Sequence, residues 1–136
     1  MKKQRFVLDS YALLAYIQAE PGGEWVRDLL KKASTGKARV FLSIINLGEV
    51  YYIIARKRGE DTAGAIVEDI SSLPVKQLEA GTERVLNAAA IKAGYPVSYA
   101  DAFAAAAALE FSAILVTGAP EFKVLESRIA IRWLAG

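Results

Sequence analysis

Short apolar runs alternate along the chain with longer segments in which apolar residues recur every three to four positions. Short runs of this kind predict buried strands, and the longer periodic segments predict helices. The predicted strands cover residues 5–8, 39–42, 75–78, 113–117 and 129–133. The predicted helices cover residues 10–18, 24–34, 44–58, 61–73, 82–93, 99–111 and 121–125, the last of them a single turn. Strands and helices that alternate in this order indicate an α/β fold.

Two of these segments show how the elements should pack. Segment 113–117 has no polar residue until its end, which is typical of a parallel strand covered on both faces. Segment 44–58 is apolar on nearly all sides, so we expect the core or a partner to bury this helix. We therefore expect a single domain, residues 1–136, folded as a three-layer α/β/α sandwich with a mostly parallel sheet of about five strands.

The composition narrows the chemistry that the chain can perform. It has no cysteine and no histidine, which excludes disulfides, zinc sites of the usual kind, cysteine nucleophiles and a serine protease triad. Apolar residues make up 54% of the chain, but no run reaches the ~20 uncharged residues that a membrane-spanning helix needs. Asp9 interrupts the first apolar run, so we expect no signal peptide, no membrane partner and a cytoplasmic location.

The basic residues are grouped although the net charge is only +2. The groups are Lys2, Lys3 and Arg5; Arg56, Lys57 and Arg58; and Arg128 with Arg132. So small a net charge argues against a generic polyanion binder. We interpret the groups as solvated ends of helices and strands, because a phosphate-binding role needs support from elsewhere.

Three acids are candidates for chemistry. Asp9 ends the first strand and is a good N-cap for the next helix, which is enough to explain it. Asp101 follows Ser98 by three residues in a variant of the capping box, so it also has a structural explanation. Glu49 lies on the apolar helix 44–58 with no Lys or Arg three or four residues away. A tertiary arginine, a partner or a metal ion would have to stabilise its charge.

These acids should meet at one edge of the sheet. In an open α/β sheet the ligand crevice lies beyond the carboxyl ends of the strands. Thr117 ends a strand at the same edge, and Glu121 is the only acid close behind it. Clustered carboxylates repel each other unless a cation lies between them, and ligation by oxygen alone favours Mg²⁺ or Mn²⁺. Such an ion can activate water for attack on a phosphodiester.

Four segments of the chain resemble the PIN-domain nucleases, and within them the VapC-like toxins of toxin–antitoxin pairs. The segments are VLDS at 7–10, LSIINLGEV at 42–50, SYADA at 98–102, and LVTG at 115–118 followed by PEF at 120–122. Each is short, but they occur in family order and span essentially the whole chain.

The resemblance implies a PIN-like fold and a metal-dependent endoribonuclease. Asp9, Glu49 and Asp101 would hold Mg²⁺ or Mn²⁺, and Thr117 would bind near the ion or orient the attacking water. The resemblance also implies an RNA substrate, a homodimer, and a small antitoxin whose C-terminal tail occupies an apolar groove and often reaches the acids with a basic side chain. Candidates for that groove are the exposed parts of Trp25, Leu29, Tyr51, Tyr52 and Ile66, each of which is equally well explained as core.

Ala119 departs from the family pattern, which usually has a fourth acid at this place. A methyl group cannot bind a cation, so a second metal site, or the water network of the first, should be weakened. The alanine is a natural variant, the mark of a degenerate copy, or an Asp→Ala change made to disarm a toxic enzyme. We favour the deliberate change, because the surrounding Thr-Gly-x-Pro-Glu-Phe segment remains family-like.

Two other functions compete with a nuclease. A catalytically inactive PIN-fold module would bind RNA or an antitoxin partner without turnover. A phosphoacceptor receiver domain would need an Asp at the end of a middle strand and a Lys near the end of a late strand. Ser43 and the segment 117–120 occupy these places, so we set the receiver domain aside.

Overall fold

The computed structural model describes residues 3–134, so Lys2 of the first basic group lies outside the described residues. The strands within this range are β1 (Gln4–Leu8), β2 (Ala38–Ser43), β3 (Lys76–Leu78), β4 (Ile114–Thr117) and β5 (Ile131–Trp133). The helices are α1 (Ser10–Ile17), α2 (Gly23–Ser34), α3 (Ile44–Arg58), α4 (Glu60–Ser71), α5 (Thr82–Gly94) and α6 (Tyr99–Glu110), with the 3-10 helix η1 (Pro120–Leu125). Every predicted element is present, and its ends differ from the prediction by at most two residues.

The five strands form one parallel sheet in the order β3-β2-β1-β4-β5. β1 is central and pairs with β2 on one side and with β4 on the other. The chain builds the sheet outward from β1 in one direction and then returns to its other side. Such a reversal of strand order leaves a crevice beyond the carboxyl ends of the strands. β1 and β4 therefore mark the expected place of a site.

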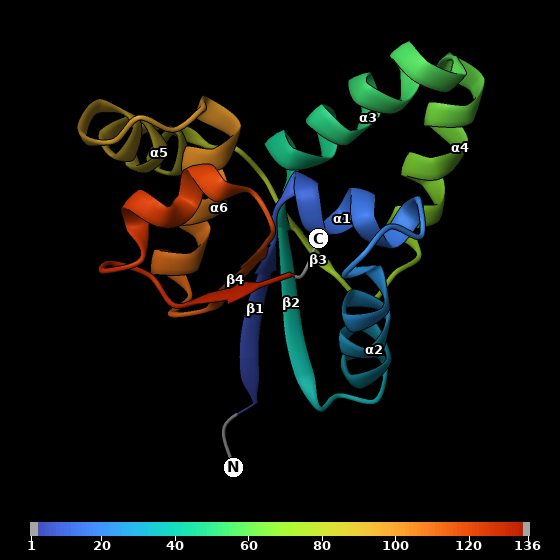
Figure 1. The fold of residues 1–136 in the computed structure, drawn as a ribbon, viewed down its shortest axis with the longest axis horizontal. Helices are drawn as coiled ribbons and strands as arrows, with labels where there is room; N and C mark the ends of the chain where they lie inside the picture. Colours follow the sequence, from blue (N-terminus) through green and yellow to red (C-terminus); the bar gives the residue numbers. More distant parts are fainter. Residues whose placement is uncertain (1–2, 135–136) are drawn as a thin grey trace.

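Helices cover both faces of the sheet, with α1 to α4 on one side and α5 and α6 on the other (Figure 1). Side chains of β1 alternate between these layers, because successive residues of a strand point to opposite faces. Phe6 and Leu8 pack toward α2, whereas Val7 packs toward α5 and α6. This arrangement confirms the predicted three-layer sandwich with a parallel sheet.

The apolar helix α3 is buried on one side only. Val50 and Ile54 are fully buried in a cluster shared by α1, α3 and α4. Tyr51 and Tyr52 on the other side remain exposed by 38% and 44%. The core thus accounts for one face of this helix and leaves the other open.

The helices α1 and α2 meet closely because Gly23 has no side chain. A Cβ atom at Gly23 would lie 2.3 Å from the carbonyl oxygen of Ala15, well inside van der Waals contact. The oxygen belongs to the backbone, so it cannot swing away as a flexible side chain would. Gly23 therefore allows the start of α2 to pack closely against α1, whose first turn follows Asp9 directly.

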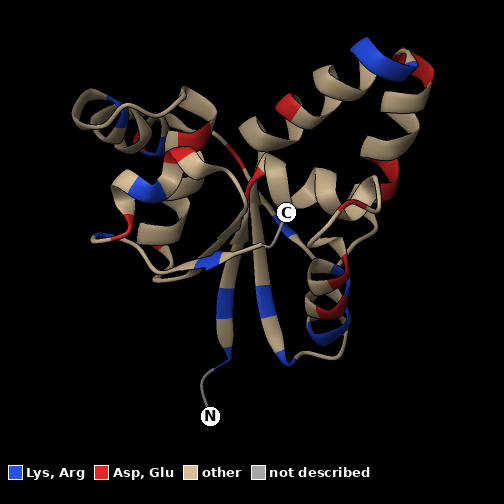
Figure 2. Ribbon diagram, in the orientation of Figure 1, with Lys and Arg blue, Asp and Glu red and all other residues tan. Residues whose placement is uncertain are grey.

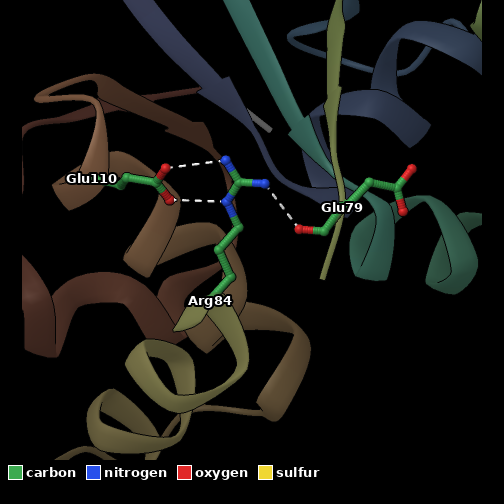
Figure 3. Close-up of polar contacts among 3 residues, drawn as sticks. All are labelled: Glu79, Arg84 and Glu110. Carbon is green, nitrogen blue, oxygen red and sulfur yellow. Dashed lines mark hydrogen bonds and ion pairs between the residues drawn. The ribbon is translucent and has the colours of Figure 1, made fainter. Parts of the chain in front are cut away.

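An ion pair locks α5 onto α6 on the opposite face (Figure 3). Arg84 donates from Nε and Nη2 to the two carboxylate oxygens of Glu110, at 3.0 and 3.1 Å. Its Nη1 donates to the backbone oxygen of Glu79 at 3.0 Å. A bidentate guanidinium–carboxylate pair constrains geometry more than a single contact does. It holds α6, which carries Asp101 in its first turn.

Among the described helices, none is both long and apolar enough to span a lipid bilayer.

Candidate functional site

The carboxyl ends of the central strands open into a shallow depression of about 370 Å³. Its lining comes from the starts of α1 and α6, the middle of α3 and the segment after β4: Asp9, Ser10, Tyr11, Leu14, Glu49, Ile53, Ser98, Asp101, Ala119 and Glu121. Acidic positions gather at this edge of the sheet (Figure 2). The fold therefore brings the three predicted acids to one surface, together with Ala119.

Asp9 caps α1 and bonds to the end of β4. Its Oδ1 accepts a hydrogen bond from the backbone N–H of Ala12 at 2.8 Å, which is the predicted N-cap. Its Oδ2 accepts one from Thr117 Oγ1 at 2.5 Å. Thr117 Oγ1 in turn accepts a bond from the N–H of Ala119 at 3.0 Å. The turn after β4 thus holds the Asp9 carboxyl through the buried hydroxyl of Thr117.

The Asp9 carboxyl is costly to ionise where it lies. Burial in the fold raises its pKa to about 7, against a lowering effect of the hydrogen bonds from Thr117 and Ala12. The charges of Asp101 and Glu49 raise the pKa further. A carboxyl that is 2% exposed and still flanked by two acids is unusual unless a cation compensates it.

Asp101 is a half-buried acid in the first turn of α6. The Ser98 hydroxyl accepts from its backbone N–H at 3.1 Å, so the predicted capping interaction is present. Desolvation raises the pKa of the Asp101 carboxyl, hydrogen bonds with Ser98 lower it, and the charges of Glu121 and Glu49 raise it again. The charges that raise it lie on two other elements, η1 and α3, which meet α6 at this depression.

Glu49 is half-buried on α3 and has one polar contact from its own helix. The Tyr52 hydroxyl donates to Glu49 Oε2 at 3.4 Å. Across residues 3–134 the ion pairs join Arg27 to Asp28 and Arg84 to Glu110, so no arginine neutralises Glu49 there. Of the three explanations that the sequence left open, a tertiary arginine is the one that the described residues do not provide.

The donor set of the depression fits a hard cation. Carboxylate and hydroxyl oxygens are the ligands that Mg²⁺ and Mn²⁺ prefer. A cation here would offset both the desolvation of Asp9 and the repulsion among the acids, which are the causes of the raised pKa values. As the side chains stand, no three His, Cys, Asp or Glu between residues 3 and 134 are grouped closely enough to ligate one ion. Binding would therefore require the more exposed carboxylates to change rotamer.

Asn46 is a polar residue of this region that the sequence did not single out. It is fully buried, and its Nδ2 donates to Ser10 Oγ and to the backbone oxygen of Ala100, both at 3.2 Å. These bonds tie α3 to the first turns of α1 and α6, so they set Glu49 relative to the other two acids. Within the described chain Asn46 Oδ1 has no hydrogen-bond partner. The sequence could have identified Asn46 by one signal, which is an amide side chain on the buried face of an apolar helix.

Tyr11 is a second residue that sequence reasoning missed. It lines the depression with 37% of its surface exposed, and its ring lies over Gly118. A Cβ atom at Gly118 would lie 2.2 Å from Tyr11 Cε1. The glycine after Thr117 therefore makes room for an aromatic ring at the rim, a relation that sequence spacing does not reveal.

The residues predicted for a partner groove lie in different surroundings. A groove of about 740 Å³ runs along α1 and α4, with Ile66, Ile17, Ile70 and Leu73 as apolar lining and Arg58, Asp61 and Asp69 as polar lining. Ile66 is the predicted residue that lines it. Leu29 is 3% exposed and belongs to the core beneath α2, so it offers almost no surface. Trp25 packs against Phe6 and Arg132.

The comparisons with solved structures concern the fold. VapBC2 from Rickettsia felis, bound to a DNA fragment from its promoter, has a TM-score of 0.72 at 14% identity, covering 97% of this chain and 100% of the other. DNA-bound VapBC from Salmonella typhimurium has a TM-score of 0.70 at 22% identity, covering 95% and 97%. VapC20 from Mycobacterium tuberculosis, a toxin that cleaves the sarcin-ricin loop, has a TM-score of 0.70 at 14% identity, covering 92% and 96%.

The family is established by the sequence itself. No curated protein sequence matches the chain. The family model of the PIN domain, however, matches residues 6–126, which include every acid of the depression. The predicted resemblance is thus confirmed, and the chain belongs to the PIN domain family.

Proposed function

We propose that this protein is a metal-dependent endoribonuclease toxin of the VapC-like kind. The observation that carries the proposal is the depression at the carboxyl edge of the sheet, where Asp9, Glu49 and Asp101 lie on one surface with no basic side chain in the lining. The likeness of the fold to VapBC toxin–antitoxin structures supports the same function.

Asp9, Glu49 and Asp101 would hold Mg²⁺ or Mn²⁺. Such an ion, when bound, lowers the pKa of water and offsets charge on a phosphodiester. Thr117 holds the Asp9 carboxyl in place by donating to Oδ2, so Asp9 presents a fixed ligand. Asn46 and Ser10 fix α3 against α1 and thereby position Glu49. Tyr11 lies exposed at the rim, where it can stack on an RNA base.

Cleavage of labelled RNA by the purified protein tests this function. We expect slow endonucleolytic cleavage with Mn²⁺ or Mg²⁺, none with EDTA or Ca²⁺ alone, and binding of Mn²⁺ in calorimetry. The rate should be low because Ala119 supplies no carboxylate at the edge of the depression. A protein that binds neither metal would contradict the proposal.

The second candidate is an inactive PIN-fold module that binds RNA or an antitoxin without turnover. Ala119 favours it, as does the absence of a ready-made group of three ligands between residues 3 and 134. It differs from a nuclease in two respects that can be measured. Such a module would bind RNA equally well with and without a divalent ion, and it would never release a cleavage product.

We further propose that the cytoplasmic protein is a homodimer that binds a small antitoxin in the groove along α1 and α4. The groove has an apolar lining and charged residues of both signs, which suits an amphipathic peptide. Ile66→Glu would place a charge in it, and we expect at least a tenfold loss of affinity for the protein encoded by the adjacent gene. Leu86→Glu is the matched control, because Leu86 is 62% exposed on α5 and outside the groove.

Light scattering of the purified complex measures its mass and so the number of copies of the chain that it contains. The expected mass contains two copies of the 14.7 kDa chain together with the partner. Equal binding by the Ile66→Glu and Leu86→Glu variants would place the partner elsewhere, and a mass with one copy of the chain would refute the homodimer.

A further inference from the structure

The two central strands project beyond the rest of the sheet at its amino-terminal edge. β1 and β2 pair from Gln4↔Ala38 onward, whereas β4 joins β1 only at Phe6 and β3 joins β2 only at Phe41. The first residues of β1 and β2 therefore form a two-stranded extension, which is visible at the lower end of the sheet (Figure 1).

Four basic residues lie on and beside this extension, and we call them the basic ribbon: Lys3, Arg5, Lys37 and Arg39. Arg5 and Arg39 are directly paired across the two strands. By the alternation of side chains they share the face of Val7 and Phe41, which is the side of α5 and α6. Lys3 Nζ lies 3.8 Å from the position that a Cβ atom at Gly36 would take, and Gly36 directly precedes Lys37. The four charges are therefore clustered.

No carboxylate compensates these charges among residues 3–134. All four residues are exposed, and the ion pairs of the described chain lie elsewhere, at Arg27 with Asp28 and at Arg84 with Glu110. Basic positions gather on the lower parts of β1 and β2 and at the end of α2, where Lys31 and Lys32 add two more (Figure 2). Like charges directly opposite on neighbouring strands destabilise a sheet. A ribbon of this kind is suited to an anionic partner.

Beside the extension, the partly exposed ring of Phe111 lies at the end of α6 and covers the buried ring of Phe41. Phe111 stacks on Phe41 with ring centroids 4.2 Å apart, and Arg39 lies 6.0 Å from the centroid of Phe41. Arg5 donates from Nη1 to the backbone oxygen of Phe111 at 3.0 Å, which holds it at the end of α6. Positive charge beside a partly exposed ring is the combination that single-stranded RNA-binding surfaces use.

We propose that the basic ribbon binds the phosphate backbone of RNA, at a place separate from the acids of the depression. The inference rests on the proposed function in taking RNA as the polyanion that this chain meets. Asp9 directly follows β1 and is four residues from Arg5, or roughly 13 Å along an extended chain. A strand of RNA that contacts both ends of β1 must reach at least this far from the bond that is cleaved. The ribbon therefore contributes to the affinity for RNA rather than to the cleavage of that bond.

Binding of a labelled 30-nucleotide single-stranded RNA, followed by fluorescence anisotropy, tests the inference without requiring cleavage. The parent protein carries Asp9→Asn so that the RNA stays intact. Lys37→Gln with Arg39→Gln removes two charges from the ribbon and spares Arg5, which bonds to the end of α6. We expect about tenfold weaker binding and a salt slope smaller by about 1.4, since each lost phosphate contact is worth about 0.7 with single strands.

The control variant removes the same charges from another surface. Arg56→Gln with Lys57→Gln takes away one arginine and one lysine at the end of α3. Equal losses in the ribbon and control variants would overturn the inference, because they would report net charge alone. Arg39→Lys keeps the charge and should retain binding, and melting temperatures verify that each variant is folded. Tighter, ribbon-dependent binding to duplex DNA of the same sequence would overturn the assignment to RNA.

The outcome separates the ribbon from the proposed nuclease. If the unmutated protein never cleaves RNA but the ribbon variant loses RNA affinity, the nuclease proposal fails and the ribbon inference stands. If the unmutated protein cleaves RNA while the ribbon variant binds RNA as tightly as its Asp9→Asn parent, the nuclease stands and the ribbon inference fails.

Discussion

We expect Asp9→Asn to remove nearly all of the proposed RNA cleavage and at the same time to stabilise the fold at neutral pH. The loss follows from the position of Asp9, whose two carboxyl oxygens are fixed by Ala12 and Thr117 at the centre of the acid cluster. An amide keeps the shape but carries no charge for a cation. Loss of a metal ligand that stabilises the transition state by roughly 4 kcal/mol lowers the rate about 1,000-fold.

The gain in stability follows from the raised pKa of Asp9, about 7 in the fold against an ordinary value of 3.8. Between these values the unfolded chain binds fewer protons than the native protein, so the free energy of unfolding falls as the pH rises from about 4 to 7. The cost of ionising Asp9 is fully present above pH 7 and disappears below pH 4. Asp9→Asn removes this cost, which is worth up to about 4 kcal/mol at pH 8.

Urea unfolding in EDTA from pH 4 to pH 8 measures the difference between the two proteins. We expect the curves to diverge with rising pH, with the variant the more stable. Adding Mn²⁺ should stabilise the unmutated protein and leave the variant unchanged, because a ligand stabilises only the state that binds it. Parallel curves for the two proteins would show that burial does not raise the pKa of Asp9. A cation would then not be needed to compensate its charge.

We expect Ala119→Asp to raise the proposed cleavage by about 10- to 100-fold, because it would add a fourth carboxylate to the oxygen ligands of the site. The backbone at Ala119 is extended, with φ −77° and ψ 118°, so an aspartate there needs no unusual backbone conformation. Its N–H donates to Thr117 Oγ1, and this bond does not involve the side chain. The added carboxylate would enter the depression beside Asp101 and Glu121.

The same change should make the metal-free protein less stable. A further negative charge adds to the repulsion that already raises the pKa of Asp101. We expect a lower melting temperature in EDTA, restored by Mn²⁺ at concentrations about tenfold below those that the alanine protein needs. Ala119→Asn is the control, since it has the same shape without the charge. A revertant that cleaves no RNA with either metal would favour the inactive module over the nuclease.

The order of the elements followed from local patterns, and the deviations have local causes. Predicted helix 61–73 ends at Ser71, since Pro74 follows closely and the N–H of Val75 bonds back to Leu73. Predicted strand 129–133 begins later, because the N–H of Ile129 is taken by Leu125 at the end of η1. The caps at Asp9, Ser43 and Ser98 were predictable, because a cap is a contact between residues two or three apart.

The sequence indicated which acids belong to the candidate site, but it did not indicate how they are arranged. Each of Asp9, Glu49 and Asp101 was marked by its place beside a strand end or on an apolar helix. Asn46 was not, although it connects α3 to α1 and α6, because its partners are 36 and 54 residues away. Leu29 could have lined a groove or belonged to the core, and it lies in the core; helical periodicity shows an apolar stripe without showing what covers it.

The sequence alone therefore determined the fold class, the family and the residue types available for chemistry, since these depend on periodicity, short motifs and the absence of His and Cys. The tertiary structure decided which side chains meet. It set Thr117 on Asp9 and gathered the acids in one depression, so that burial and repulsion raise their pKa values. It also brought Arg5 and Arg39 into register at the opposite edge. Pairings of this kind join residues far apart in sequence, and only the packing of the sheet and its helices fixes them.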